Sequence, residues 1–284
     1  MHRGFRDDGE VTLAERQSAI RPIAARFRYL PGRRRPRRGH LQRLAKGRSP
    51  CYIGGDEFLL QSMKATPDEN PPHAAAHMRV SYEMAELREE DLAPDPVDQF
   101  AVWFQETVSA KLPEPNAMTL ATVDGSGRPA QRAVLLKHWD KSGFVFFTNK
   151  ESRKATHMAA NPEVSLHFLW LDLQRQVSIS GRVEPVSLAQ TAAYFALRPF
   201  GSQIGAWLSP QSQVVSSKAM LLAKLDEIKR KFADGKVPVP SFWGGYRVVP
   251  REFEFWQGGR DRLHDRFRYS KNPDGIWLHE RLAP

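Results

Sequence analysis

The hydrophobic positions near residue 100 repeat at the spacing of an α-helix. They share one helical face: Phe100, Trp103, Phe104 and Val108. Asp95 is a favoured N-cap residue, and proline, which follows it, is favoured at the first helical position. The pattern therefore predicts a helix from the residue after Asp95 to about Lys111.

Most of the later apolar runs are short and are separated by turn residues, which is typical of strands. Two runs around Asp124–Gly127 predict a β-hairpin of residues 118–123 and 131–137. Further strands are predicted at 144–148, 164–170, 176–183, 245–249, 252–256, 266–269 and 276–279. Helices are predicted at 152–160, where Ser152 can act as the cap, at 187–197, and at 216–233, which has an apolar stripe.

The order of these elements predicts the fold class. There is no strand–helix–strand rhythm and no G-x-G-x-x-G motif. Short strands joined mostly by short turns favour a mainly β (α+β) protein, an antiparallel barrel with peripheral helices, over a doubly wound sheet.

Residues 1–77 differ from the remainder, because apolar periodicity is weak and arginine is abundant. The formal net charge of the chain is +10, and the stretch Arg21–Arg48 alone holds ten Arg, one Lys and no acidic residue, or +11. The difference, 10 − 11, leaves about −1 elsewhere, so the charge says little about partners of the folded part. We expect residues 1–77 to be a disordered basic extension and residues 78–284 to be the folded domain.

Three interpretations of the extension stay open: a nucleic-acid-binding arm, a transport signal, or a non-native extension with Met63 or Met78 as the true start. We favour a non-native extension or an inert tail over a specific role, and do not expect a nucleic-acid partner. Cys51 is the only cysteine, so no intrachain disulfide can form. No run of about 18 apolar residues suggests a membrane span. A cytoplasmic location is expected.

Two basic clusters are candidate anion sites. Arg132 and Lys137 lie in an otherwise apolar run, where an unpaired charge is unfavourable unless it faces an anion or solvent. Their spacing of five would place them on opposite faces of a regular strand, so a shared ligand requires the strand to bulge or end, or to bind through two surfaces. Arg153 and Lys154 lie at a predicted helix N-terminus, where free N–H groups favour phosphate.

A third cluster consists of Tyr194, Arg198 and Ser202. Tyr194 and Arg198 are one helical turn apart and can share a face. An arginine, a phenol and a hydroxyl suit a phosphate or a phenolic ring, although a solvated helix end is the simpler interpretation from these residues alone.

The C-terminal run contains Trp256, two glycines, and then Arg262, His264 and Arg266. If the run is a strand, its alternation places these three basic residues on one face. Three like charges on one face repel, so a ligand explains them better than folding does. No metal-ligand spacing or catalytic triad stands out.

From about Met78 onward the sequence resembles pyridoxamine 5'-phosphate oxidases. The matching segments are Gln131–Lys137, Thr148-Asn149 with Ser152–Ala155, Arg175–Val177, Ser202–Trp207, Pro240–Gly245, Phe255–Gly259, Arg262–Arg266 and Arg281–Pro284. They occur in order over about three quarters of the chain.

The resemblance implies an FMN-binding split barrel that works as a homodimer, with two flavins at the subunit interface. It implies FMN contacts from Arg132, Ala133, Val134, Leu135, Leu136, Lys137, Phe147, Thr148, Arg153, Lys154, Gln176, Gln211, Ser212, Trp256 and Arg266. It implies substrate contacts from Arg79, Tyr82, Lys137, Tyr194, Arg198, Ser202, Arg262 and His264, with Arg262 and His264 as the catalytic pair.

The implied reaction converts pyridoxamine or pyridoxine 5'-phosphate to pyridoxal 5'-phosphate with oxygen, releasing hydrogen peroxide. One departure is Phe147, where many members have Tyr. If the hydroxyl of that Tyr contacts the flavin in the family, this chain should bind the flavin more weakly. If the backbone of the residue makes the contact, the flavin affinity should be unchanged. A split-barrel reductase with another substrate and a non-enzymatic pyridoxal phosphate carrier are the alternatives.

Overall fold

The computed structural model describes residues 81–208 and 210–284. The predicted basic extension and Arg79 lie outside the described residues. The chain divides into two units, Met1–Pro67 and Asp68–Pro284, and the fold described below belongs to the second unit. No helix in the described part is long and apolar enough to cross a membrane.

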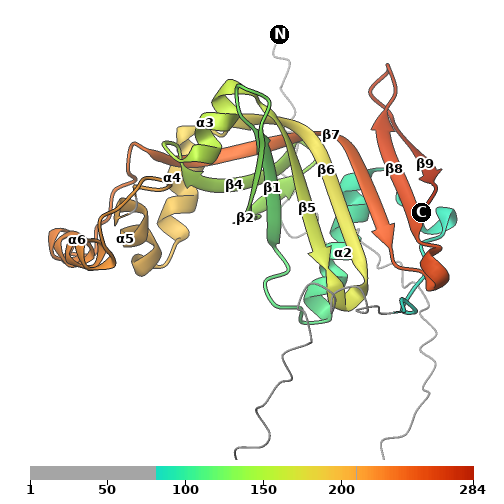
Figure 1. Ribbon diagram of the computed structural model, residues 1–284, viewed down its shortest axis with the longest axis horizontal. Coiled ribbons are helices and arrows are strands. Elements are labelled where there is room, and N and C mark those ends of the chain that lie inside the picture. Colours follow the sequence, from blue (N-terminus) through green and yellow to red (C-terminus); the bar gives the residue numbers. More distant parts are fainter. Residues whose placement is uncertain (1–80, 209) are drawn as a thin grey trace, which may run out of the picture. The chain divides into compact units, whose positions relative to one another are not determined.

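The second unit is built on one antiparallel sheet that curls into a split barrel, as predicted (Figure 1). Its strands are β1 (Ala117–Val123), β2 (Pro129–Leu135), β3 (His138–Asp140), β4 (Gly143–Asn149), β5 (Glu163–Trp170), β6 (Arg175–Pro185), β7 (Trp243–Gln257), β8 (Asp265–Lys271) and β9 (Trp277–Leu282). The strand order is β2-β1-β5-β6-β7-β4-β3, with β8 on β7 and β9 on β8.

Strand β7 links the two halves of the sheet. Its first part pairs with β4 and its second part with β8, while β6 pairs along the other edge. The sequence predicted two strands here, and that prediction is wrong. Pro250, which cannot donate a backbone hydrogen bond, lies opposite Gly181 at a register shift, so the strand continues through it.

The helices surround this sheet. They are α2 (Pro96–Ser109), α3 (Arg153–Ala160), α4 (Leu188–Leu197), α5 (Phe200–Leu208) and α6 (Lys218–Lys231), with short 3-10 turns at Glu89–Asp91, Leu171–Leu173 and Arg260–Arg262. The Asp95 side chain accepts a hydrogen bond from the Val97 N–H, as predicted for an N-cap. Ser152 precedes α3 but does not cap it, because its hydroxyl donates to the Asn149 carbonyl at 2.7 Å. Strand β3 and helix α5 were not predicted.

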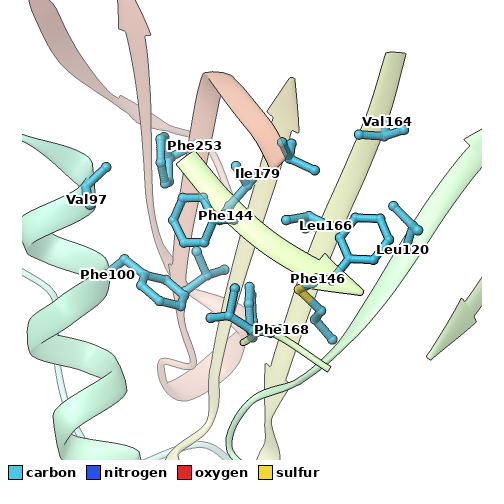
Figure 2. Packing of buried hydrophobic residues seen from close by; sticks show 14 of the residues in the cluster. Val97, Phe100, Leu120, Phe144, Phe146, Val164, Leu166, Phe168, Ile179 and Phe253 are labelled. Carbon is cyan, nitrogen blue, oxygen red and sulfur yellow. The ribbon is translucent and has the colours of Figure 1, made fainter. Parts of the chain in front are cut away.

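The main core lies between α2 and the concave face of the sheet. Alternating residues of the strands point into it, and Phe100 of α2 packs edge-on against Phe144 of β4 with ring centroids 4.9 Å apart (Figure 2). A second, smaller cluster of Ile204, Ile228 and Phe232 joins α5 to α6. The sheet therefore fixes β2, β4 and α3 relative to one another, and these elements carry the site.

Candidate active site

A cavity of about 740 Å³ opens among β2, β4, α3, the α4–α5 junction and the segment after α5. It brings together fourteen of the residues implicated by the sequence: Arg132, Ala133, Val134, Leu135, Lys137, Phe147, Thr148, Arg153, Lys154, Tyr194, Arg198, Ser202, Gln211 and Ser212. Five further lining residues were not predicted: Ala130, Gln131, Leu197, Pro199 and Trp243. Leu136 does not line the cavity, because its side chain is buried in the main core.

The end of β2 explains how Arg132 and Lys137 face one cavity. The strand stops at Leu135, and the Lys137 N–H donates to the Val145 carbonyl on β4 at 2.9 Å. The chain therefore leaves the plane of the strand between the two cations. Their spacing left three possibilities for a shared ligand: a bulge, the end of the strand, or binding through two surfaces. The structure shows that the strand ends.

Lys154 is a buried cation held by neutral oxygens. Its ammonium group donates to Gln211 Oε1 at 2.8 Å, Thr148 Oγ1 at 3.0 Å and Ser152 Oγ at 3.2 Å. Burial lowers the pKa of Lys154 to about 8, and the charge of Arg132 acts in the same direction. An anion placed here would favour the charged amine.

Arg132 extends the same cluster. Burial lowers its pKa, and the positive charge of Arg153 acts in the same direction. Arg153 begins α3, where its own N–H donates to Ser212 Oγ at 3.3 Å. Arg132, Arg153 and Lys154 therefore form a first cationic cluster beside the N-terminal turn of α3, a combination that suits phosphate.

A second cationic cluster lies at the α4–α5 junction. Burial lowers the pKa of both Lys137 and Arg198, and Arg198 further lowers that of Lys137. The guanidinium of Arg198 lies 4.8 Å from the centre of the Trp243 ring, and its buried Nη1 has no hydrogen-bond partner among the described residues. A buried donor without a partner is unfavourable, so this atom is a strong candidate for contact with an anion.

Three parallel rings form one wall of this cluster. Phe147 stacks on Tyr194 with centroids 4.1 Å apart, and on Trp243 with centroids 5.3 Å apart. The stack holds Tyr194 and Arg198 on the cavity side. The described lining residues include five cations and no Asp or Glu. Because no Asp or Glu lines the cavity beside the two cationic clusters, the cavity suits a ligand, or two ligands, carrying two anionic groups.

The remaining predicted residues form a separate group on β6, β7 and β8, and none of them lines the cavity. Trp256 pairs with Gln176 on one side and Arg266 on the other. Tyr82 and His264 pack on Trp256 with ring centroids 5.8 Å and 4.6 Å away. These five residues and Arg262, in the turn before His264, form a second surface, and none of them is buried.

The predicted alternation of Arg262, His264 and Arg266 along a strand is wrong. Arg262 ends a 3-10 turn, and both it and Asp261 have left-handed backbone angles, with φ of 65° and 55°. Strand β8 begins only at Asp265. Arg266 pairs with Glu254 at 2.9 Å, whereas exposed Arg262 has no hydrogen bond or ion pair among residues 81–208 and 210–284.

His264 is oriented by the same turn. Its Nδ1 accepts the Gly259 N–H at 3.1 Å, so in the neutral ring Nε2 carries the proton and remains available as a donor. Both glycines are explained by close approach rather than by a ligand. A Cβ at Gly259 would lie 2.2 Å from the Leu263 carbonyl oxygen, and one at Gly258 would lie 2.8 Å from Tyr82.

The two groups are far apart along one chain. Trp243 lines the cavity and Trp256 belongs to the second surface, and both lie on β7. Thirteen residues of fully extended strand span at most about 40 Å, and the register shift at Pro250 shortens this distance. The cavity and the second surface therefore lie at opposite ends of β7.

The fold and the cavity define a split-barrel protein built to receive anionic ligands. The family described as pyridoxamine 5'-phosphate oxidase matches residues 104–232, and the pyridoxine 5'-phosphate oxidase C-terminal dimerisation region matches residues 243–284. A pyridoxine/pyridoxamine 5'-phosphate oxidase of Prochlorococcus marinus is 54% identical over 76% of this chain and 98% of its own length. A pyridoxine/pyridoxamine 5'-phosphate oxidase of Cupriavidus necator is 53% identical over 74% of this chain and 98% of its own length. The chain therefore belongs to the pyridoxamine 5'-phosphate oxidase family, whose members are oxidoreductases.

Solved structures agree on the fold. PhzG of Burkholderia lata, determined in complex with tetrahydrophenazine-1-carboxylic acid, has a TM-score of 0.67 and 28% identity over 72% of this chain and all of its own. A pyridoxamine 5'-phosphate oxidase-related, FMN binding protein of Nostoc punctiforme has a TM-score of 0.55 and 15% identity over 68% of this chain and all of its own, a likeness of fold alone.

The turn at Gly259 gives a first testable prediction. Gly259→Ala should lower the free energy of unfolding by about 1–3 kcal/mol in urea denaturation, because the backbone at Leu263 must shift. Gly205→Ala is the matched control, since it lies in α5 with nothing within 4 Å of its would-be Cβ, and should be neutral or slightly stabilising. Equal effects of the two substitutions would contradict this account.

Proposed function

We propose that this chain binds FMN and oxidises pyridoxamine and pyridoxine 5'-phosphate to pyridoxal 5'-phosphate, with oxygen as the acceptor and hydrogen peroxide as the second product. The observation that carries the proposal is the cavity with two cationic clusters and no acidic lining residue. FMN and the substrate each carry one phosphate, so the cavity offers one cluster to each. The relatives at about half identity support the same reaction. With one cysteine and no possible intrachain disulfide, we propose a cytoplasmic location.

The first cluster would hold FMN. Arg132, Arg153 and Lys154 fit its phosphate, and Thr148, Gln211 and Ser212 are already hydrogen-bonded to this cluster. A bound FMN supplies the redox chemistry, namely hydride acceptance from C4′ and reoxidation by oxygen. The protein's part is to bind, orient and enclose.

The second cluster would hold the substrate phosphate through Lys137, Tyr194, Arg198 and Ser202. The unpartnered Nη1 of Arg198 is the donor that this phosphate would satisfy. Phe147 contributes its ring to the stack beneath Tyr194, and a ring contact needs no hydroxyl. The replacement of the usual Tyr by Phe147 is therefore compatible with this site.

The second surface would complete the site of another copy. We propose a homodimer in which Gln176, Trp256 and Arg266 of one chain contact the FMN held by its partner, while Tyr82, Arg262 and His264 contact the substrate there. The length of β7 supports this arrangement, because it separates the two groups within one chain. The match of residues 243–284 to a dimerisation region also supports it. Arg262 would cover the pyridine ring, and the Nε2–H of His264 would orient it.

The central test is an oxygen-dependent assay of the full chain reconstituted with FMN. We expect a bound-flavin absorbance spectrum and equal amounts of pyridoxal 5'-phosphate and hydrogen peroxide from pyridoxine 5'-phosphate. A colourless protein that FMN cannot reconstitute would refute the proposal. Bound flavin without product would favour a split-barrel reductase, and bound product without oxygen consumption would favour a carrier.

Shared sites predict complementation between variants of the two groups. Arg198→Met and Arg262→Ala should each lower turnover at least about 100-fold, because each removes an orienting contact. In co-expressed mixtures, half of the dimers combine both chains, and each has one intact site of two. Activity should then recover to about a quarter of the wild-type value. A site within one chain would show no recovery.

The depressed pKa of Lys154 predicts how FMN affinity varies with pH. The phosphate is already doubly charged above about pH 7, so it does not titrate in this range. As the pH rises through about 8, the ligand-free protein loses the Lys154 proton that the phosphate needs. Affinity should fall about fivefold to tenfold between pH 7.5 and 9, measured by quenching of flavin fluorescence. Lys154→Met should bind more weakly at pH 7.5 and show little of this slope.

A further inference from the structure

A chain of hydrogen bonds behind the first cationic cluster connects two of its arginines. Arg132 of β2 donates from Nη1 to Thr122 Oγ1 of β1 at 2.8 Å. Thr122 Oγ1 lies 3.2 Å from Nδ1 of His157 on α3. The Nε–H of Arg153, one turn earlier on the same helix, donates to His157 Nε2 at 3.3 Å.

The donors and acceptors of this chain fix the tautomer of His157. An arginine nitrogen can only donate, so Nε2 of His157 is the acceptor and Nδ1 carries the proton. Nδ1–H then donates to Thr122, whose hydroxyl accepts from both sides and donates its own hydrogen to the Ala130 carbonyl at 3.4 Å. Every hydrogen-bonding position of the Thr122 hydroxyl is therefore used.

Burial makes the link rigid. His157 and Thr122 are 6% and 1% exposed, so water does not compete for these bonds. The two arginines that they join repel each other, since the charge of Arg153 lowers the pKa of Arg132. The neutral ring of His157 accepts a hydrogen bond from Arg153 and donates one to Thr122. It therefore holds both guanidinium groups in place without adding charge.

We propose that His157 is a positioning residue for the phosphate of the flavin cofactor, acting through Arg153 directly and through Thr122 on Arg132. This proposal rests on the proposed function, which assigns that cluster to FMN. His157 does not line the cavity, so its effect is transmitted by the arginines alone. Its contribution should therefore depend on the phosphate and be absent for a flavin without one.

The test compares FMN with riboflavin, which lacks the phosphate, as ligands of the full ligand-free chain. His157→Leu removes both hydrogen bonds and should weaken FMN binding about tenfold while changing riboflavin binding less than about twofold. His157→Gln retains one acceptor and one donor, and should restore FMN affinity to within about threefold of wild type. Thr122→Val removes the hydroxyl that links His157 to Arg132 and leaves the hydrogen bond between Arg153 and His157. It should therefore also weaken FMN binding.

Met158→Leu is the matched control, because Met158 is the next residue of α3, is equally buried, and contacts neither arginine through a hydrogen bond. It should leave both affinities unchanged. Equal loss of FMN and riboflavin binding in His157→Leu, or no loss of either, would overturn the proposal. Wild-type protein that binds neither flavin, or binds both equally, would instead refute the assignment of the cluster to FMN.

Discussion

Repulsion among five cations around one cavity is the constraint that the structure has to satisfy. No carboxylate belongs to the described lining, and neutral groups hold three of these cations. The Leu120 carbonyl and Thr122 hold Arg132, three side-chain oxygens hold Lys154, and the ring of Trp243 lies against Arg198. These contacts fix directions without cancelling charge. The site is thereby preorganised for anions, and a bound anion would also stabilise the fold.

The sheet supplies the rigidity that such an arrangement needs. Strands β1, β2 and β4 carry Thr122, Arg132 and Thr148. Helix α3 lies against β1, and its His157 and Lys154 form hydrogen bonds with Thr122 and Thr148. A small rotation of α3 would move Arg153 and Lys154 together. The main core under these elements is formed by aromatic and aliphatic side chains (Figure 2).

Local patterns predicted most elements, because caps and hairpin turns are determined by neighbouring residues. Asp95 caps its helix as predicted, and Ser187, the first residue of the predicted helix 187–197, caps α4. The failures involve distant partners. Pro250 suggests a break in β7 unless the opposing Gly181 is known, and the three-residue β3 has too few residues to show a period. Residue type does not reveal the left-handed backbone angles at Asp261 and Arg262. The alternation of basic residues from Arg262 to Arg266 therefore predicts a strand where the structure has a turn.

In the candidate site, too, some residues could be predicted from the sequence and others could not. Resemblance to a family named fourteen of the nineteen residues that line the cavity. It gave no role to Trp243, Thr122 and His157, which contact the cationic side chains Arg198, Arg132 and Arg153. One signal was available, since His157 follows Arg153 by four residues on a predicted helix and so had to share its face.

The length of β7 has a consequence for how the protein behaves when it is scarce. If each cofactor is held by the cavity of one chain and the far end of another chain's β7, dissociation of the dimer exposes half of every flavin contact. Cofactor retention then becomes a function of protein concentration, and subunits diluted below their dimer dissociation constant would release flavin before they unfold. If β7 separates the two halves of each flavin site in this way, the protein would keep its flavin only as long as it remains a dimer.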